Sequence, residues 1–271
     1  MLIILSIGFI APSKLYAVEI AVGPSAWYLW LDQPYTKNVY DDNYVSKYEP
    51  EIFYGPAISV KFNDDFNLSF IYLYGKFPVT EIDDPGNGFA NKIKYKFIRK
   101  DSDLALSYRL DDRLRVFAGI KYMSIKDEFN YPLQSGFGTG LLFDLEHSGI
   151  GPGFGFNFTY PVYKDLLLTA NLSRFYLWGK ETKGFMRFHP SGGSNPPVPT
   201  SAKADFNDTG FNFSLSFAYY IAPLSTAISF GGRVQYVKTE YKDYDSDFLY
   251  KGDTCKFYGF TATAIYSFSI L

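Results

Sequence analysis

The feature that most constrains this chain is an alternation of apolar and polar side chains with a period of two residues, recurring along almost its whole length. In the segment 103–110, Leu104 and Leu106 lie on one face, and polar or small residues occupy the other. A turn at 111–112 follows, and 113–124 alternates again. Two alternating runs joined by a tight turn are typical of a β-hairpin. The sequence therefore predicts an all-β fold.

The connections between the alternating segments are of two kinds. Ten strands are predicted, at 20–31, 52–62, 66–76, 92–110, 113–124, 150–160, 166–179, 210–221, 227–237 and 256–270. Four connections are tight, and five are long: 32–51, 77–91, 124–149, 180–209 and 238–253. Short and long connections that take turns are typical of a transmembrane antiparallel up-and-down β-barrel. Eight or twelve strands remain alternatives, because 180–209 is long enough for a further hairpin.

The two faces of the strands differ in a way that favours an apolar exterior. Phe154, Phe156 and Phe158 share one face of their strand, whereas Gly155 and Asn157 lie on the other. A soluble barrel would need to hold all such rings in its interior, which is too much volume for ten strands. We therefore predict an apolar outer face and a polar lumen. The charged residues of lumen parity are Asp101, Asp103, Arg109, Arg115, Lys121 and Arg233.

Composition excludes several classes of function. The formal net charge is −2, which offers no basic surface for nucleic acid. One cysteine and two histidines leave little for a metal or redox centre, so we expect no cofactor. Asp243, Asp245 and Asp247 lie at alternate positions, as in a calcium loop, but Phe248 stands where that loop needs glycine. We read this segment as a solvated acidic loop.

The first residues have the outline of a secretory signal peptide. An apolar run is followed by Pro12, Ser13 and Lys14, and Ala17 precedes an abrupt change to polar sequence. The sequence thus predicts a signal peptide at 1–17 and one barrel domain at 18–271. Beyond Ala17, no run of apolar residues reaches the length of a membrane-spanning helix.

The last strand carries the most specific resemblance. Phe260, Tyr266, Phe268 and Ile270 share one face up to the end of the sequence, which resembles the closing strand of bacterial outer-membrane β-barrel proteins. The chain is similar to the small OmpA-like, OmpW-like and opacity-protein barrels, without the motif of one subfamily. The resemblance implies an outer-membrane location in a Gram-negative bacterium, a monomer, and recognition of the last strand by the barrel-assembly machinery. It also implies contact with outer-membrane lipid and lipopolysaccharide.

Two enzyme classes share this architecture. Omptin proteases need an Asp-x-His pair, and neither His147 nor His189 has an aspartate two residues before it. Outer-membrane lipid hydrolases place a histidine and a serine two residues apart on a strand, a spacing that His189 and Ser191 share. That pair lies in a segment rich in Pro, Gly and Ser, which favours a loop. Both histidines are therefore predicted to be solvated loop residues, and no residue is assigned a catalytic role.

A lysine ladder lies on the outward parity of the fourth predicted strand, beyond the apolar span that begins at Leu104. It consists of Lys92, Lys94, Lys96 and Lys100. Lipopolysaccharide phosphates would be within reach of these side chains, so the ladder is a candidate contact with that lipid.

Three functions follow from this reading. The first is a non-enzymatic surface barrel with acidic outer loops and a lumen closed by internal ion pairs, such as Asp103 with Arg115 or Lys121. The second is a narrow passive pore for small solutes, which would use the same lumen residues. The third is a lipid hydrolase that uses His189 and Ser191.

Overall fold

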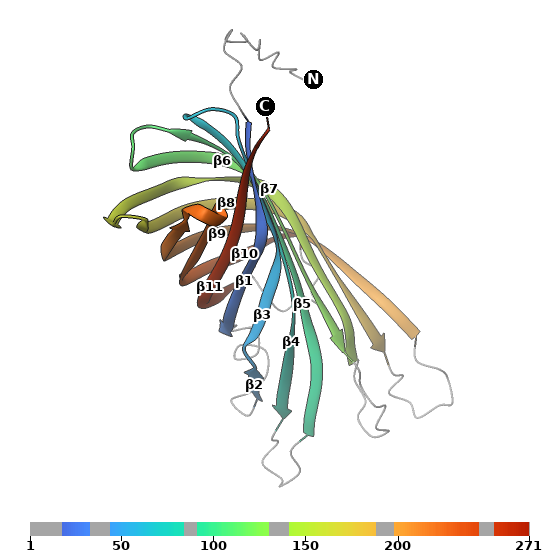
Figure 1. Ribbon diagram of the computed structural model, residues 1–271. Coiled ribbons are helices and arrows are strands. Elements are labelled where there is room, and N and C mark those ends of the chain that lie inside the picture. The colour runs from blue at the N-terminus through green and yellow to red at the C-terminus, as the bar shows by residue number, and fades with distance from the viewer. Residues whose placement is uncertain are drawn as a thin grey trace, which may run out of the picture.

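The structure is a computed structural model that describes residues 18–32, 44–83, 91–129, 141–187, 198–243 and 252–270 (Figure 1). The strands are β1 (Val18–Asp32), β2 (Tyr44–Tyr48), β3 (Glu51–Lys61), β4 (Phe66–Asp83), β5 (Asn91–Arg109), β6 (Leu114–Phe129), β7 (Leu141–Tyr163), β8 (Leu166–Arg187), β9 (Val198–Ile221), β10 (Thr226–Asp243) and β11 (Gly252–Ile270). One turn of 3-10 helix, η2 (Ala222–Leu224), joins β9 to β10. Within the described residues, no helix is long and apolar enough to cross a membrane.

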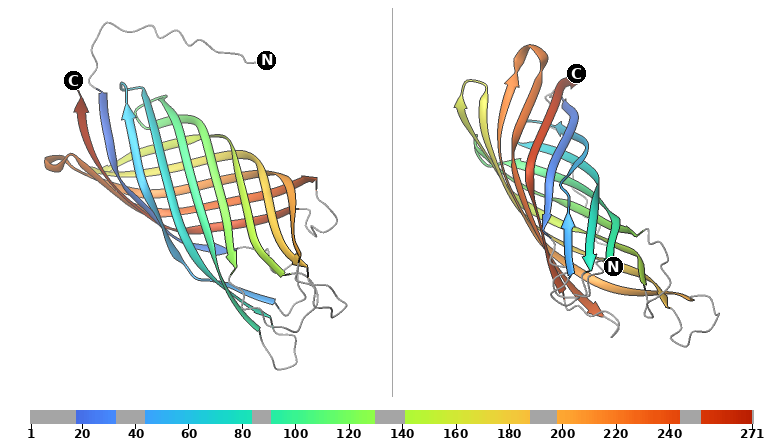
Figure 2. Two further views of the ribbon diagram at one scale, coloured as in Figure 1. Left: turned by 90° about the vertical axis from the view of Figure 1, so that its right-hand side faces the viewer. Right: turned by 90° about the horizontal axis from the view of Figure 1, so that it is seen from below.

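Ten of these strands close into an antiparallel barrel. Each pairs with its neighbour from β3 to β11, and β1 pairs with both β11 and β3. Figure 2 shows the closed wall and its strongly tilted strands. The short strand β2 pairs with β4 beyond the start of β3, so it continues the path of β3 after a break at 49–50. The predicted ten-stranded transmembrane-type barrel is confirmed.

The strands are staggered around the barrel. Following directly paired residues from Ile20 through all ten strands leads back to β1 at Asp32, twelve residues further along. Such a stagger requires tilted strands, and it sets which residues of distant strands share a level. Because the strands tilt, side chains on opposite walls meet only where this offset brings them to the same height.

Side-chain acceptors close two of the short turns. Asn63 Oδ1 accepts hydrogen bonds from the N–H groups of Asp65 and Phe66, and Asp111 Oδ1 does the same for the N–H groups of Arg113 and Leu114, where β6 begins. Lys61 lies 3.0 Å from the Asp64 carboxylate, and this hydrogen bond holds the pKa of that exposed carboxyl below its usual range. The short turns and both described ends of the chain lie at the same end of the barrel (Figure 1).

The strands extend further than predicted at the opposite end. The long connections predicted at 77–91, 124–149, 180–209 and 238–253 are shorter than predicted, since β4 continues to Asp83, β6 to Phe129 and β10 to Asp243, and β9 begins at Val198. The apolar alternation reverses in these extensions. On β9, Lys203 and Asp205 are exposed, while Ala204 and Phe206 are buried inside. The sequence analysis identified strands by an apolar outward face, so it assigned these strand ends, whose outward face is charged, to loops.

Candidate functional site: the closed lumen

The inward-facing charges divide between two levels of the lumen. Asp101 and Lys121 are buried, and Lys121 donates hydrogen bonds of 3.0 Å to both carboxylate oxygens of Asp103. By contrast, Arg109 and Arg115 lie opposite each other next to the short turns, where both are partly exposed. Of the two partners predicted for Asp103, the structure thus places Lys121 beside it and Arg115 at the mouth of the barrel.

Arg99 is the central residue of the part of the lumen nearer the long connections, and the sequence analysis did not identify it. Its guanidinium donates to both oxygens of Asp101, at 2.9 and 2.7 Å, and is fully buried. The same group reaches Gln235 Oε1 at 2.5 Å. Because β5 and β10 are five strands apart in a ten-stranded ring, the two side chains extend from opposite walls and meet inside the barrel. The parity that Arg99 shares with Asp101 was the signal that could have found it.

Aromatic rings fill the space around Arg99. The inward rings at this level belong to Trp27, Phe53, Phe77, Phe97, Phe175 and Phe257. The guanidinium carbon lies 3.8 Å from the centroid of Phe257 and 5.6 Å from that of Phe53, within the range of cation–π attraction. All six rings are at most 2% exposed. We call these six rings, together with Arg99, Asp101, Lys121 and Gln235, the plug.

A second polar cluster lies beyond the plug, toward the long connections. The two ring nitrogens of His147 are each 3.0 Å from a carboxylate oxygen, one of Glu181 and one of Asp208. The ring stacks on Phe206 at 3.6 Å, and Thr239 donates to Asp208. The prediction that His147 is a solvated loop residue was wrong, because β7 begins before it and its side chain is buried. This cluster ties β7, β8, β9 and β10 together.

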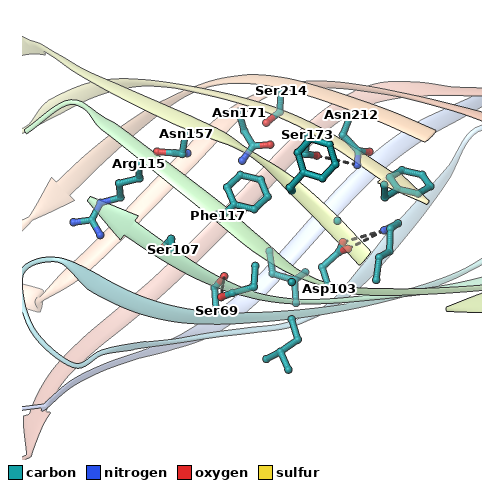
Figure 3. Close-up of a pocket in the computed structure, with 18 of the residues that line it drawn as sticks. Ser69, Asp103, Ser107, Arg115, Phe117, Asn157, Asn171, Ser173, Asn212 and Ser214 are labelled. Carbon is teal, nitrogen blue, oxygen red and sulfur yellow. Dashed lines mark hydrogen bonds and ion pairs between the residues drawn. The ribbon is translucent and has the colours of Figure 1, made fainter. Parts of the chain in front are cut away.

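A polar cavity of about 510 Å³ occupies the lumen between the plug and the short turns. Figure 3 shows the side chains that line it, with the Asp103–Lys121 pair at one end and Arg115 at the other. Asparagines, serines and threonines make up half of the lining residues, and Asn212 donates to Ser173 and accepts from Arg233. Such a wall offers hydrogen-bond partners to water, whereas the aromatic rings of the plug do not.

Several predicted residues fall at the limits of the described structure. Lys96 and Lys100 are exposed on the outer face of β5; Lys92 and Lys94 belong to the same strand, but their side chains lie outside the described part. Asp243 ends β10, and its side chain is likewise outside it. The remaining candidates, Asp245, Asp247, His189, Ser191 and the segment 1–17, are outside the described residues. Among the described side chains, no group of three or more His, Cys, Asp or Glu residues is arranged so that it could hold a metal ion.

The outer wall carries an apolar band between two rings of aromatic side chains. Phe154, Phe213 and Phe217 are among the exposed residues of the band. One ring, near the short turns, includes Tyr108, Tyr160, Tyr219 and Tyr266. The other ring, nearer the long connections, includes Tyr28, Tyr74, Tyr122, Tyr176, Tyr236 and Tyr258. Among the described outward positions between the rings, Arg174 alone is charged, and its direct neighbours are Phe154 and Phe211.

A closed barrel with an apolar belt, two aromatic girdles and a polar interior is a transmembrane β-barrel of the outer-membrane class. A family model described as Legionella pneumophila major outer membrane protein precursor matches residues 61–196, half of the chain. The chain belongs to this family, and its location is the bacterial outer membrane. No curated protein matches it.

Solved structures with a similar arrangement are distant in sequence. The outer membrane protease OmpT of Escherichia coli is 12% identical, with a TM-score of 0.45 over 95% of this chain and 99% of that one. A major outer membrane protein of Thermus thermophilus is 12% identical, with a TM-score of 0.43 over 93% and 100%. The Ralstonia pickettii toluene transporter TbuX is 11% identical, with a TM-score of 0.39 over 95% and 90%.

Proposed function

We propose that this protein is a closed, non-enzymatic outer-membrane barrel that acts through its outer surface and long connections. The observation that carries the proposal is the hydrogen bond by which Arg99 and Gln235 meet from opposite walls of the lumen. The six surrounding rings are each at most 2% exposed. A charge that crossed the plug would have to leave water for a packed aromatic interior, at a cost of several kcal/mol. Passive diffusion of ions is therefore disfavoured.

Single-channel recording in a planar bilayer tests this proposal. The folded protein should give a silent bilayer, with folding verified by its heat-modifiable migration on gels. The double variant R99A/F257A should conduct, because it removes the guanidinium that spans the lumen and the ring it stacks on. The matched control is Asn171→Ala, which enlarges the polar cavity between the plug and the short turns and should stay silent.

Two outcomes of the recordings would contradict the proposal. Discrete, stable steps from the unaltered protein, reduced or reversed in ion preference by Lys121→Ala, would replace this proposal with a pore for small solutes. Silence of the double variant would show that the plug is not the barrier.

A further inference from the structure

A group of lysines on the outer wall spans three neighbouring strands. Lys76 on β4 and Lys126 on β6 stand on either side of Ile98 of β5. Lys96 and Lys100 lie two residues before and after Ile98, on the same face. Neighbouring strands are about 4.8 Å apart, and alternate residues about 7 Å apart. The register thus gathers the four lysines around one point, and we call them the lysine patch.

Burial at the centre of the patch shows how its side chains lie. Ile98 and Ser124 have outward parity, yet each is only 8% exposed. In the apolar band, outward residues such as Phe154 are 58% exposed. We attribute the difference to the aliphatic stems of the surrounding lysines, since lysine packs its stem on apolar surface and keeps its ammonium in water. The ammonium groups therefore project from a common base.

Acidic residues lie at the edge of the patch, but its lysines are not ion-paired within the described structure. None of the four lysines makes an ion pair there, whereas Lys238 on β10 lies 2.6 Å from Glu240. Glu146 borders the patch opposite Lys126, and Glu128 stands opposite Lys96 with a side chain outside the described part. Four ammonium groups so close together repel one another, and an anionic ligand would relieve that repulsion.

The height of the patch indicates the ligand. Lys76 follows Tyr74, a member of the aromatic ring nearer the long connections, by two residues. Lys100 pairs directly with Ser124, two residues beyond Tyr122 of the same ring. Aromatic girdles mark the boundary between hydrocarbon and headgroups. Lys100 also pairs directly with Tyr74, so the patch begins at that boundary and extends beyond it on the side of the long connections, which face the outside of the cell. The lipid of that leaflet is lipopolysaccharide, which carries phosphates at this depth.

We infer that the lysine patch is a binding site for the phosphate groups of lipopolysaccharide, held against the outer wall of β4, β5 and β6. Two or more ammonium groups converge on each phosphate, and the acyl chains lie on the apolar band, on the side of the patch toward the short turns. The ladder predicted along one strand thus becomes a site on three strands, with Lys76 and Lys126 supplied by the neighbours of β5.

Binding of purified lipopolysaccharide to the full protein in detergent micelles tests this inference. The variant K76Q/K96Q/K100Q/K126Q should lose at least about tenfold in affinity, since each lysine near an anionic lipid surface contributes up to about fivefold. The matched control is K238Q/K242Q, which removes exposed outer lysines on β10 and should bind within about twofold of the unaltered protein. Heat-modifiable migration verifies that every variant is folded.

Two competitors identify the source of the phosphate. Phosphatidylglycerol and inorganic phosphate at the same concentration should not displace lipopolysaccharide. Equal affinity of the patch variant and the unaltered protein would overturn the inference, and so would equal losses in the two variants. Binding of phosphatidylglycerol with the same dependence on the patch would overturn the assignment to lipopolysaccharide in favour of anionic lipid in general. A silent or conducting bilayer has no bearing on these results, so this test and that of the proposed function fail separately.

Discussion

At the scale of single residues, Arg99 matters most because three kinds of interaction converge on it. Arg99→Ala leaves the buried Asp101 carboxylate with Lys121 alone, 3.5 Å away, and Gln235 Oε1 without its donor. Removing one partner of a buried ion pair destabilises a protein by about 3–5 kcal/mol. We expect a loss of that size in the free energy of unfolding, measured by urea titration of the folded barrel.

The control for this prediction is Arg109→Ala at the mouth of the barrel. Arg109 forms ion pairs of 3.4 and 3.7 Å with Asp65 and Asp112, but those groups are exposed. Surface pairs contribute about 0–1 kcal/mol. Equal losses in the two variants would mean that the ion pair in the plug is no stronger than one in water.

Arg174 presents the opposite case, a charge whose removal should help. It faces lipid between Phe154 and Phe211, two residues before Tyr176 of the aromatic ring nearer the long connections. A charged side chain on the lipid face is unfavourable, by less near the interface than at the midplane. Arg174→Leu should therefore raise the free energy of unfolding in lipid vesicles by about 1 kcal/mol. A loss of stability would show instead that Arg174 has a partner in the membrane.

At the scale of strands, the contact between β8 and β9 depends on a glycine. A Cβ added at Gly210 would lie 1.9 Å from the ring of Phe175, so Gly210→Ala should cost about 1–3 kcal/mol in unfolding free energy. Combined with Phe175→Leu, the same substitution should cost less than it does alone, as a double-mutant cycle measures. At Gly232, the nearest atom to an added Cβ is 3.8 Å away, and Gly232→Ala should change stability little. A full cost in the double variant would contradict this account.

The strands also show what the sequence could and could not predict. Alternation identified every strand of the barrel inside the apolar band, because lipid outside and water inside impose a strict contrast. It failed in the extensions, where Phe206 lies inside and Asp205 outside. There water surrounds the wall and the lumen is packed, so the contrast has the opposite sign. His147 was misplaced for the same reason, since the strand that carries it looked like a loop.

At the scale of the whole molecule, partners across the lumen lay beyond sequence reasoning. Arg99 and Gln235 are 136 positions apart, and they meet only because ten strands and a twelve-residue stagger bring them to one level. Inward parity can be read from local sequence, as it was for Asp103 and Lys121. The pairing of opposite walls requires the closed barrel, and with it the distinction between plug and cavity.

The position of the plug also gives the barrel a direction. It lies on the side of the long connections, and the cavity of about 510 Å³ lies between it and the short turns. With the lumen closed at the plug, as proposed above, water would reach that cavity past the short turns, which face the periplasm, and not past the plug. Although the barrel sits in the outer membrane, the polar cavity would then share the ions and the acidity of the compartment beneath that membrane.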